Sequence, residues 1–304
     1  MRFVLLFGFL FYILPGFSQL SQNELVVSGI TKAKLGDYEA AFTDFNKAIS
    51  LDSTEVEPWY NRGVVKSEMG DYHGAIEDFN VVIAISPNYA EPWYNRGVAR
   101  DYLEDHAGAI LDYSKAILMK PDYPEAFLNR GLAKFDLGIY REAIQDFSRA
   151  LHYRPEFAEA YYNRGLARFN QGQFSEAISD FNEAIRLDPT PAEYFSSRGA
   201  TKASRGEYEE AIIDLNEAIY KRPDDVNPRL NKALAFMYLK QYAKAEKEYS
   251  AILEIDPTIA EAFANRGVTR QYMDDLVGAC EDWDMAATLG SEKARNYFQK
   301  FCDR

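Results

Sequence analysis

Small, apolar and polar positions recur along the chain at one fixed spacing. The tripeptide Asn-Arg-Gly begins at residues 61, 95, 129, 163 and 265, and each interval is 34 residues or a multiple of 34. Glycine continues the phase at Gly29 and Gly199, and Ala233 takes the remaining place. A period of this length accommodates two amphipathic helices and their turns, so the pattern predicts a tandem array of helix pairs.

Each period carries its own helix breaks. If the recurring small residue is numbered position 8, glycine at position 15 ends the first helix, because it adopts the tight turn at little cost. Proline at position 32 cannot continue a helix, so it closes the unit. Position 15 is glycine in five units: Gly36, Gly70, Gly138, Gly172 and Gly206. Position 32 is proline in six units: Pro87, Pro121, Pro155, Pro189, Pro223 and Pro257.

On this numbering, eight contiguous units fill residues 22–293 without an insertion. Their boundaries are 22–55, 56–89, 90–123, 124–157, 158–191, 192–225, 226–259 and 260–293. Position 20 is alanine in all eight units, and position 24 is aromatic in every unit except the sixth, which has Leu215. Small residues at positions 8 and 20 allow close helix approach, and the large residue at position 24 fills the space between neighbours.

The period and these motifs resemble the tetratricopeptide repeat (TPR) family over about nine-tenths of the chain. The resemblance implies an all-α fold, a right-handed α-solenoid of eight tandem 34-residue helix-turn-helix repeats. It further implies that the first helix of each repeat lines a concave groove, where ligands of such proteins bind. Proteins of this kind usually bind other proteins and do not catalyse reactions.

The two ends of the chain depart from the period. Residues 1–18 combine Arg2, an apolar run over 3–14 and small residues at Gly16 and Ser18, which together predict a signal peptide. Residues 19–21 form a short lead. We therefore expect an exported bacterial protein, periplasmic or secreted, with an uncleaved anchor as the alternative. Residues 294–304 are amphipathic and predict a capping helix over the last repeat.

Asparagine recurs at position 6, on the groove face of the first helix. A carboxamide both donates and accepts hydrogen bonds, which suits the alternating N–H and C=O groups of an extended peptide. Helix spacing of about 8–10 Å against about 3.3 Å per extended residue lets one asparagine meet a peptide roughly every third residue. The alternative is that the asparagines bond within the array. The six asparagines are Asn61, Asn95, Asn129, Asn163, Asn231 and Asn265.

Glutamate and tyrosine accompany these asparagines on the same face. Glutamate at position 2 occurs in six units and also complements the helix dipole. It disfavours the family's carboxylate clamp for acidic tails, so we expect a neutral or basic ligand. Tyr94 and Tyr162 at position 5 are the tyrosines we select as peptide-binding candidates, and Tyr102, Tyr238 and Tyr272 at position 13 are further rings for stacking.

A basic and an acidic position recur together and predict a structural ion-pair ladder. Position 7 is basic in seven units, and position 23 is acidic in all eight. The first unit has Asp44 but Ser28 at position 7, so pairing each acid with the next unit's base leaves fewer groups unpaired. On this scheme Lys300 of the capping helix answers Asp282.

Composition excludes several functions. The formal net charge of −13 argues against nucleic-acid binding, which needs clustered Lys and Arg. The three histidines fall at unrelated phases, and no nucleophile, phosphate-loop or metal motif appears, so we expect no enzyme, no cofactor and no metal site. Cys280 is expected to be a small core residue, with a disulfide to Cys302 as the alternative in an oxidising compartment.

We therefore predict a scaffold that binds an extended neutral or basic peptide segment of a protein partner. The predicted contacts are the six asparagines with Tyr94 and Tyr162. One alternative is a module that binds carbohydrate or cell-wall glycan through the same groove. Another is a structural component of an envelope assembly, bound through its convex face.

Overall fold

The structure is a computed structural model, and it describes residues 20–303. That part of the chain contains seventeen α-helices and no strand. The chain divides into two compact units, one up to Met119 and one from Lys120 onward, and each is described by itself. The predicted signal peptide, residues 1–18, lies outside the described residues.

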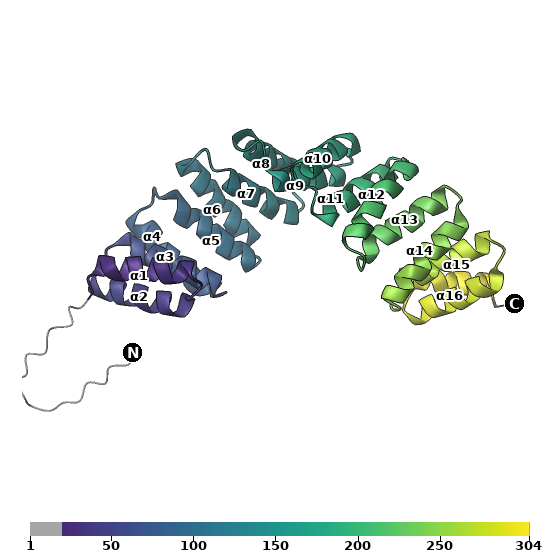
Figure 1. Cartoon of the computed structure of the whole chain (residues 1–304), viewed down its shortest axis with the longest axis horizontal. Coiled ribbons are helices and arrows are strands. Elements are labelled where there is room, and N and C mark those ends of the chain that lie inside the picture. Colours follow the sequence, from purple (N-terminus) through teal and green to yellow (C-terminus); the bar gives the residue numbers. More distant parts are fainter. Residues whose placement is uncertain (1–19, 304) are drawn as a thin grey trace, which may run out of the picture. The chain divides into compact units, whose positions relative to one another are not determined.

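Unit 1 contains three antiparallel helix pairs (Figure 1). The first helix of each pair has thirteen residues, and the second has fourteen. The helices are α1 (Gln22–Lys34), α2 (Tyr38–Leu51), α3 (Val56–Glu68), α4 (Tyr72–Ile85), α5 (Ala90–Tyr102) and α6 (His106–Met119).

Unit 2 contains five further pairs and a final single helix, α17. Its helices are α7 (Pro124–Asp136), α8 (Tyr140–Tyr153), α9 (Ala158–Asn170), α10 (Phe174–Leu187), α11 (Ala192–Ser204), α12 (Tyr208–Lys221), α13 (Val226–Tyr238), α14 (Tyr242–Ile255), α15 (Ala260–Tyr272), α16 (Leu276–Thr288) and α17 (Glu292–Phe301). Every odd-numbered helix from α1 to α15 begins 34 residues after the previous one, which is the spacing read from the sequence. The all-helical tandem arrangement is therefore confirmed, whereas the partition into eight repeats stays a prediction.

The turn inside each pair requires a left-handed backbone at position 15. Gly172 has a φ of 74° at this point between α9 and α10. In three pairs the position is not glycine, yet Glu104, Lys240 and Asp274 take the same conformation, with φ of 62°, 59° and 63°. Glycine therefore makes this turn cheap, and the helix packing on both sides enforces it where glycine is missing.

The core of each pair is built as the sequence predicts. Ala177 and Phe181 on α10 are fully buried, as are their counterparts in the other pairs. A Cβ atom added to Gly165 on α9 would lie 2.6 Å from Cε1 of Phe181, so the small residue at position 8 makes room for the ring at position 24. The same contact recurs between Gly63 and Phe79 in unit 1.

The ion-pair ladder exists, but its predicted pairing is wrong. Arg62 of α3 binds Asp78 of α4 in the same helix pair, with Nη2 2.7 Å from Oδ1. The other amino nitrogen of Arg62 reaches back to the Asn46 carboxamide of the preceding pair. Antiparallel packing within a pair brings positions 7 and 23 face to face, whereas the link between pairs uses position 25.

A second cation, at position 11, was missed by the sequence analysis. Lys66 lies 3.1 Å from Asp78, and Arg168 lies 2.7 Å from Asp180, so the nearly buried acid is held by two bases. In the first pair, Lys32 and Ser28 both hydrogen-bond Asp44, which removes the orphan that motivated the inter-repeat scheme.

The carboxyl-terminal helix α17 packs on α16. Tyr297 and Phe301 lie beside the fully buried Trp283, at ring-centroid distances of 5.3 Å and 5.7 Å. A disulfide joins Cys280 of α16 to Cys302 at the end of α17, which was the alternative interpretation of these cysteines. Asp282 is bound by Arg266 and Arg270, so the predicted partner Lys300 is wrong, and its ammonium lies over the Phe301 ring.

Among residues 20–303, no helix combines the length and the apolar character needed to cross a bilayer.

Candidate functional site

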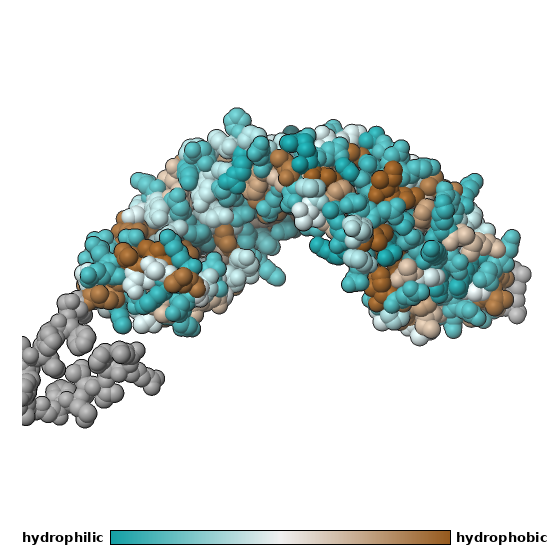
Figure 2. All heavy atoms as spheres, viewed as in Figure 1, coloured by the Kyte–Doolittle hydropathy of each residue, from teal (hydrophilic) through white to brown (hydrophobic). Residues whose placement is uncertain are grey.

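The candidate site is the surface formed by positions 2, 5, 6, 9 and 13 of the odd-numbered helices, called here the A-face. It is described within each unit separately. Figure 2 shows a surface that is largely hydrophilic, with hydrophobic residues in scattered groups.

In unit 1 the two asparagines bond differently. The Asn61 side-chain amide donates to the Glu57 carbonyl one turn earlier on α3, at 2.9 Å. The Asn95 amide on α5 donates instead to the Tyr60 hydroxyl of the preceding pair, also at 2.9 Å. Asn95 therefore links two helix pairs, as the structural alternative proposed, while the Asn61 amide is held along its own helix.

In unit 2 the asparagines are half-buried on α7, α9, α13 and α15. The Asn163 amide donates one hydrogen bond to the Glu159 carbonyl, at 2.9 Å. Its second N–H and its carbonyl oxygen have no hydrogen bond among the described residues. For Asn231 and Asn265, the part of the chain that the structure describes shows no side-chain hydrogen bond. Asn129 occupies the corresponding place on α7.

The two candidate tyrosines are also half-buried, and each packs on the aromatic ring at position 24 of its own pair. Tyr94 lies 5.8 Å from Tyr113 in unit 1, and Tyr162 lies 5.8 Å from Phe181 in unit 2, measured between ring centroids. The Tyr162 hydroxyl lies 3.3 Å from the Ser197 hydroxyl on α11. Each ring therefore has a structural role and keeps an exposed part on the A-face.

Two of the predicted residues share a pocket in unit 2. Tyr162 and Asn163 line a pocket of about 530 Å³ between α7, α9 and α11. Its remaining lining residues are Leu132, Phe157, Ala158, Glu159, Asp188, Glu193 and Tyr194. Because its only charged residues are three carboxylates, it is called here the acidic pocket.

The charge of the acidic pocket acts on its tyrosines. Burial, together with the weaker effect of the carboxylates of Asp188, Glu159 and Glu193, raises the pKa of Tyr194 to about 12. Burial also raises the pKa of Tyr162. Both phenols therefore stay protonated, and the pocket offers hydroxyl groups and negative charge to a ligand.

The sequence analysis did not select Phe157, Asp188 or Tyr194 as site residues. Tyr194 stands at position 3, where the other units carry proline, alanine or glutamate. That departure from the repeat was a usable signal, because a large ring there lies 4.6 Å from Tyr162 between centroids.

The exposed tyrosines at position 13 have partners that the sequence analysis also missed. Tyr102, Tyr238 and Tyr272 each stack in parallel on a tyrosine that starts the second helix of the preceding pair. The partners are Tyr72, Tyr208 and Tyr242, at centroid distances of 4.5 Å, 4.9 Å and 5.0 Å. The recurrence of tyrosine at position 17 was the signal. These rings brace adjacent pairs and present one free face to solvent.

Within residues 20–303, no three His, Cys, Asp or Glu side chains gather in a way that could hold a metal ion.

The sequence profile described as "Tetratricopeptide repeat" matches residues 94–151, 128–192 and 198–260, and a second profile, "TPR repeat", matches residues 31–70 and 67–100. These matches cover more than half of the chain, so the protein belongs to the tetratricopeptide repeat family. TPR proteins generally act as non-catalytic scaffolds for protein partners.

Solved TPR structures share the fold. The C-terminal part of a TPR protein from Cytophaga hutchinsonii has a TM-score of 0.65 at 18% identity, over 78% of this chain and 97% of that one. A TPR protein from Parabacteroides merdae has a TM-score of 0.59 at 17% identity, over 84% and 98%. YrrB, whose structure is described as having an unusual peptide-binding site, has a TM-score of 0.54 at 22% identity, over 62% and 97%.

Among curated proteins, RNA polymerase II-associated protein 3 from Xenopus tropicalis is 34% identical over 88 residues. The match covers 27% of this chain and 13% of that protein. The chain therefore matches only a small part of the length of this relative.

Proposed function

We propose that the protein is a scaffold whose A-face binds an extended peptide segment of a partner, with a preference for basic segments. The observation that carries the proposal is the acidic pocket, in which Tyr162 and Asn163 lie together with three carboxylates. The family and the peptide-binding description of YrrB support the general role.

The pocket has the groups that a lysine or arginine side chain needs. Its aromatic and aliphatic residues accommodate the methylene stem, while Glu159, Asp188 and Glu193 attract the charged end. The Asn163 carbonyl oxygen accepts from a peptide N–H, and its second amide hydrogen donates to a peptide carbonyl. An acidic segment is repelled by the same carboxylates, which excludes it as a ligand of this pocket.

The test uses a ten-residue, N-acetylated and C-amidated peptide of glycine and serine with lysine at every third position. Fluorescence anisotropy of the labelled peptide should give a Kd on the order of 1–100 μM with the purified protein. The same peptide with glutamate in place of lysine should bind at least about tenfold more weakly, because each carboxylate pair repels.

Two variants locate the site. Asn163→Ala removes one or two peptide hydrogen bonds and should weaken binding about fivefold. Asn216→Ala changes an exposed residue of α12 and serves as the matched control, with an unchanged Kd. Equal affinity for the lysine and glutamate peptides would contradict the proposal, as would an unchanged Kd for Asn163→Ala.

We also propose that the protein acts outside the cytosol. The apolar run over residues 3–14 supports export, and the Cys280–Cys302 disulfide is a bond that an oxidising compartment allows. Mass spectrometry of the protein from its native cells would test this. A mature chain beginning at Gln19 supports the proposal, and a cytosolic full-length chain contradicts it.

A further inference from the structure

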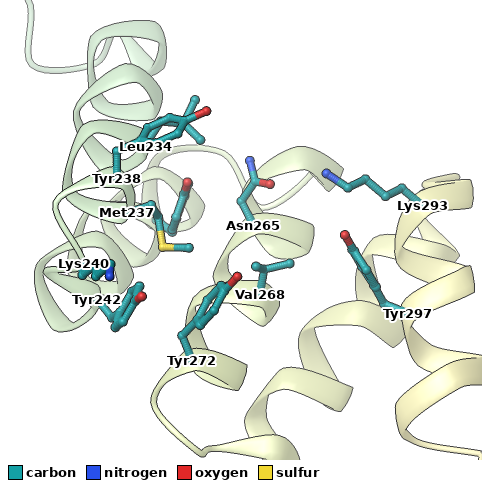
Figure 3. Close-up of a pocket in the computed structure, with 11 residues that line it drawn as sticks. Leu234, Met237, Tyr238, Lys240, Tyr242, Asn265, Val268, Tyr272, Lys293 and Tyr297 are labelled. Atoms are coloured by element: carbon teal, nitrogen blue, oxygen red, sulfur yellow. The ribbon is translucent and has the colours of Figure 1, made fainter. Parts of the chain in front are cut away.

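A second pocket of unit 2 is lined by two lysines and no carboxylate, whereas the acidic pocket is lined by three carboxylates and no base. It has a volume of about 420 Å³ and lies between α13, α15 and α17. Figure 3 shows Met237, Val268 and Tyr272 around its apolar part and Asn265 and Lys293 at its upper edge. Its other lining residues are Leu234, Tyr238, Lys240, Tyr242, Tyr249 and Tyr297.

One wall of this pocket contains a buried hydroxyl group without a hydrogen-bond partner. Tyr249 is fully buried, and its phenolic oxygen has no partner among the described residues. Leaving such a group unsatisfied is costly, so native proteins rarely keep one without a reason. The unpaired hydroxyl is therefore a candidate contact for a ligand.

Comparison with unit 1 shows that this unpaired hydroxyl is not a general consequence of tyrosine at position 24. Tyr113 holds the same place in the α5/α6 pair, and its hydroxyl donates to the Asp101 carboxylate at 2.7 Å. The residue that corresponds to Asp101 in the α13/α14 pair is Met237. The apolar side chain therefore removes the internal acceptor and leaves Tyr249 available.

Every Asn, Tyr and Lys side chain that lines the pocket can donate a hydrogen bond. Its only charged lining residues are Lys240 and Lys293, although the chain as a whole carries a net charge of −13. Burial raises the pKa of Tyr249, and the carboxylate of Glu261 raises it further, so this phenol remains a donor. The Asn265 amide adds a donor without a partner in the described part of the chain.

From this geometry we propose that the α13/α15/α17 pocket binds an apolar, ring-sized group that carries a carboxylate. The group packs against Met237 and Val268, between the rings of Tyr238 and Tyr272. The carboxylate accepts hydrogen bonds from Tyr249 and Asn265 and pairs with Lys293. Because the Tyr249 hydroxyl is buried, binding requires the flexible Met237 side chain, whose sulfur accepts a hydrogen bond from the Thr269 hydroxyl, to move aside.

This chemistry occurs at the carboxyl terminus of a peptide with an apolar last residue and in free aryl or alkyl acids. Leu234, Tyr238, Asn265, Val268 and Tyr272 of this pocket also lie on the A-face. The inference is nevertheless independent of the basic-peptide proposal, because this pocket and the acidic pocket share no lining residue. The acidic pocket and this pocket are tested with different probes and different variants.

The experiment is a titration followed by methyl NMR. The chain has six methionines, so ¹³C-methyl labelling gives a simple spectrum, and a Met237→Leu variant assigns the Met237 signal. The probe is N-acetyl-L-phenylalanine, and its matched control is N-acetyl-L-phenylalanine amide, which lacks the carboxylate. We expect the acid to shift the Met237 signal saturably and the amide to bind at least about tenfold more weakly.

The matched variant is Tyr249→Phe, which removes one oxygen from a place where four other pairs carry phenylalanine. It should weaken the acid about fivefold, while leaving the protein as stable as wild type or more so. Acid and amide binding with equal affinity would overturn the proposal, as would a Tyr249→Phe variant that binds the acid normally.

A third arm separates the two sources. An eight-residue peptide that ends in phenylalanine is compared with N-acetyl-L-phenylalanine. Tighter binding of the peptide, lost on amidation, identifies a chain terminus as the ligand. Tighter binding of the free acid identifies a small organic acid, and no shift of Met237 with either probe overturns the proposal.

Discussion

The α9/α10 pair and the α13/α14 pair have the same backbone plan but differ at positions 8, 11, 15, 23 and 24 of the repeat. In the first, Asp180 holds Arg164 and Arg168, and Phe181 packs over Gly165. In the second, Glu248, Phe236 and Tyr249 replace the acid, the second base and the ring. Ala233 and Lys240 replace the two glycines.

This difference coincides with a difference in the surface. The α9/α10 pair lines part of the acidic pocket, whereas the α13/α14 pair contributes Met237, Lys240 and Tyr249 to the α13/α15/α17 pocket, called here the cationic pocket. Departures from a self-consistent repeat cost stability, and proteins usually retain them where a function requires them. Positions that depart from the repeat therefore indicate a specific site better than the positions that follow it.

The largest expected effect is the loss of stability when the acid of an ion-pair cluster is replaced, and it should differ between Asp180 and Glu248. Asp180→Asn should cost about 3–5 kcal/mol of unfolding free energy, because the side chain is 3% exposed and two bases lose their partner. Glu248→Gln should cost less, about 1–2 kcal/mol, because Glu248 is 13% exposed, even though Lys232 and Arg229 lie 2.7 Å and 3.4 Å from it. Urea unfolding followed by circular dichroism measures both, and equal losses would remove this part of the comparison.

The disulfide sharpens the comparison at the capped end. Replacing Cys280 and Cys302 together with alanine should lower the unfolding free energy of the α16/α17 region by about 3 kcal/mol, since the bond closes a loop over a separation of 22 residues. Hydrogen exchange should become faster in α17 and remain unchanged in α9. Faster exchange throughout unit 2 would show that the bond stabilises more than the cap.

A smaller effect on stability is expected for the two tyrosines at position 24, Tyr113 and Tyr249, and only one of the two replacements should be destabilising. Tyr113→Phe removes a hydrogen bond to the Asp101 carboxylate and should cost about 1.5 kcal/mol. Tyr249→Phe should cost nothing, because its hydroxyl has no internal partner to lose. Thermal unfolding of the two variants compares them directly, and a loss for Tyr249→Phe would reveal a structural role for that oxygen.

The smallest effect, absent at neutral pH, concerns the acidic pocket. Because burial raises the pKa of Tyr194 to about 12, its contribution to stability is complete below about pH 10 and is lost as the pH rises toward 12. Tyr194→Phe should reduce the slope of stability against pH in this window. An unchanged slope would show that folding does not raise the pKa of Tyr194.

The sequence predicted the helix pairs well because turns and buried contacts require particular residue types at fixed positions. Examples are Gly172 at the turn and Ala177 and Phe181 in the core. It did not predict the direction of the ion pairs. Spacing alone allowed Asp78 to meet either its own or the next arginine, and only antiparallel packing within a pair decides this. The bonding of the asparagines was equally hidden, because Asn95 reaches Tyr60 of the preceding pair.

The candidate site was predicted in part. Tyr162 and Asn163 are consecutive residues on the A-face of α9, so helix periodicity alone was enough to predict that they lie in one site. Asp188 directly follows α10 of the same pair, whereas Tyr194 comes from α11 of the neighbouring pair, so its approach depends on packing between pairs. The cationic pocket depends on α17 and on the absence of an acceptor at Met237, which no repeat motif records.

The most direct test of the account is a crossed titration of the two pockets. The lysine peptide and N-acetyl-L-phenylalanine are each titrated into wild type, Glu159→Gln/Glu193→Gln and Lys240→Gln/Lys293→Gln. We predict that the glutamate variant weakens binding of the lysine peptide alone and that the lysine variant weakens binding of the acid alone, each about tenfold. If either variant weakens both probes equally, the two pockets do not discriminate by charge and the account is contradicted.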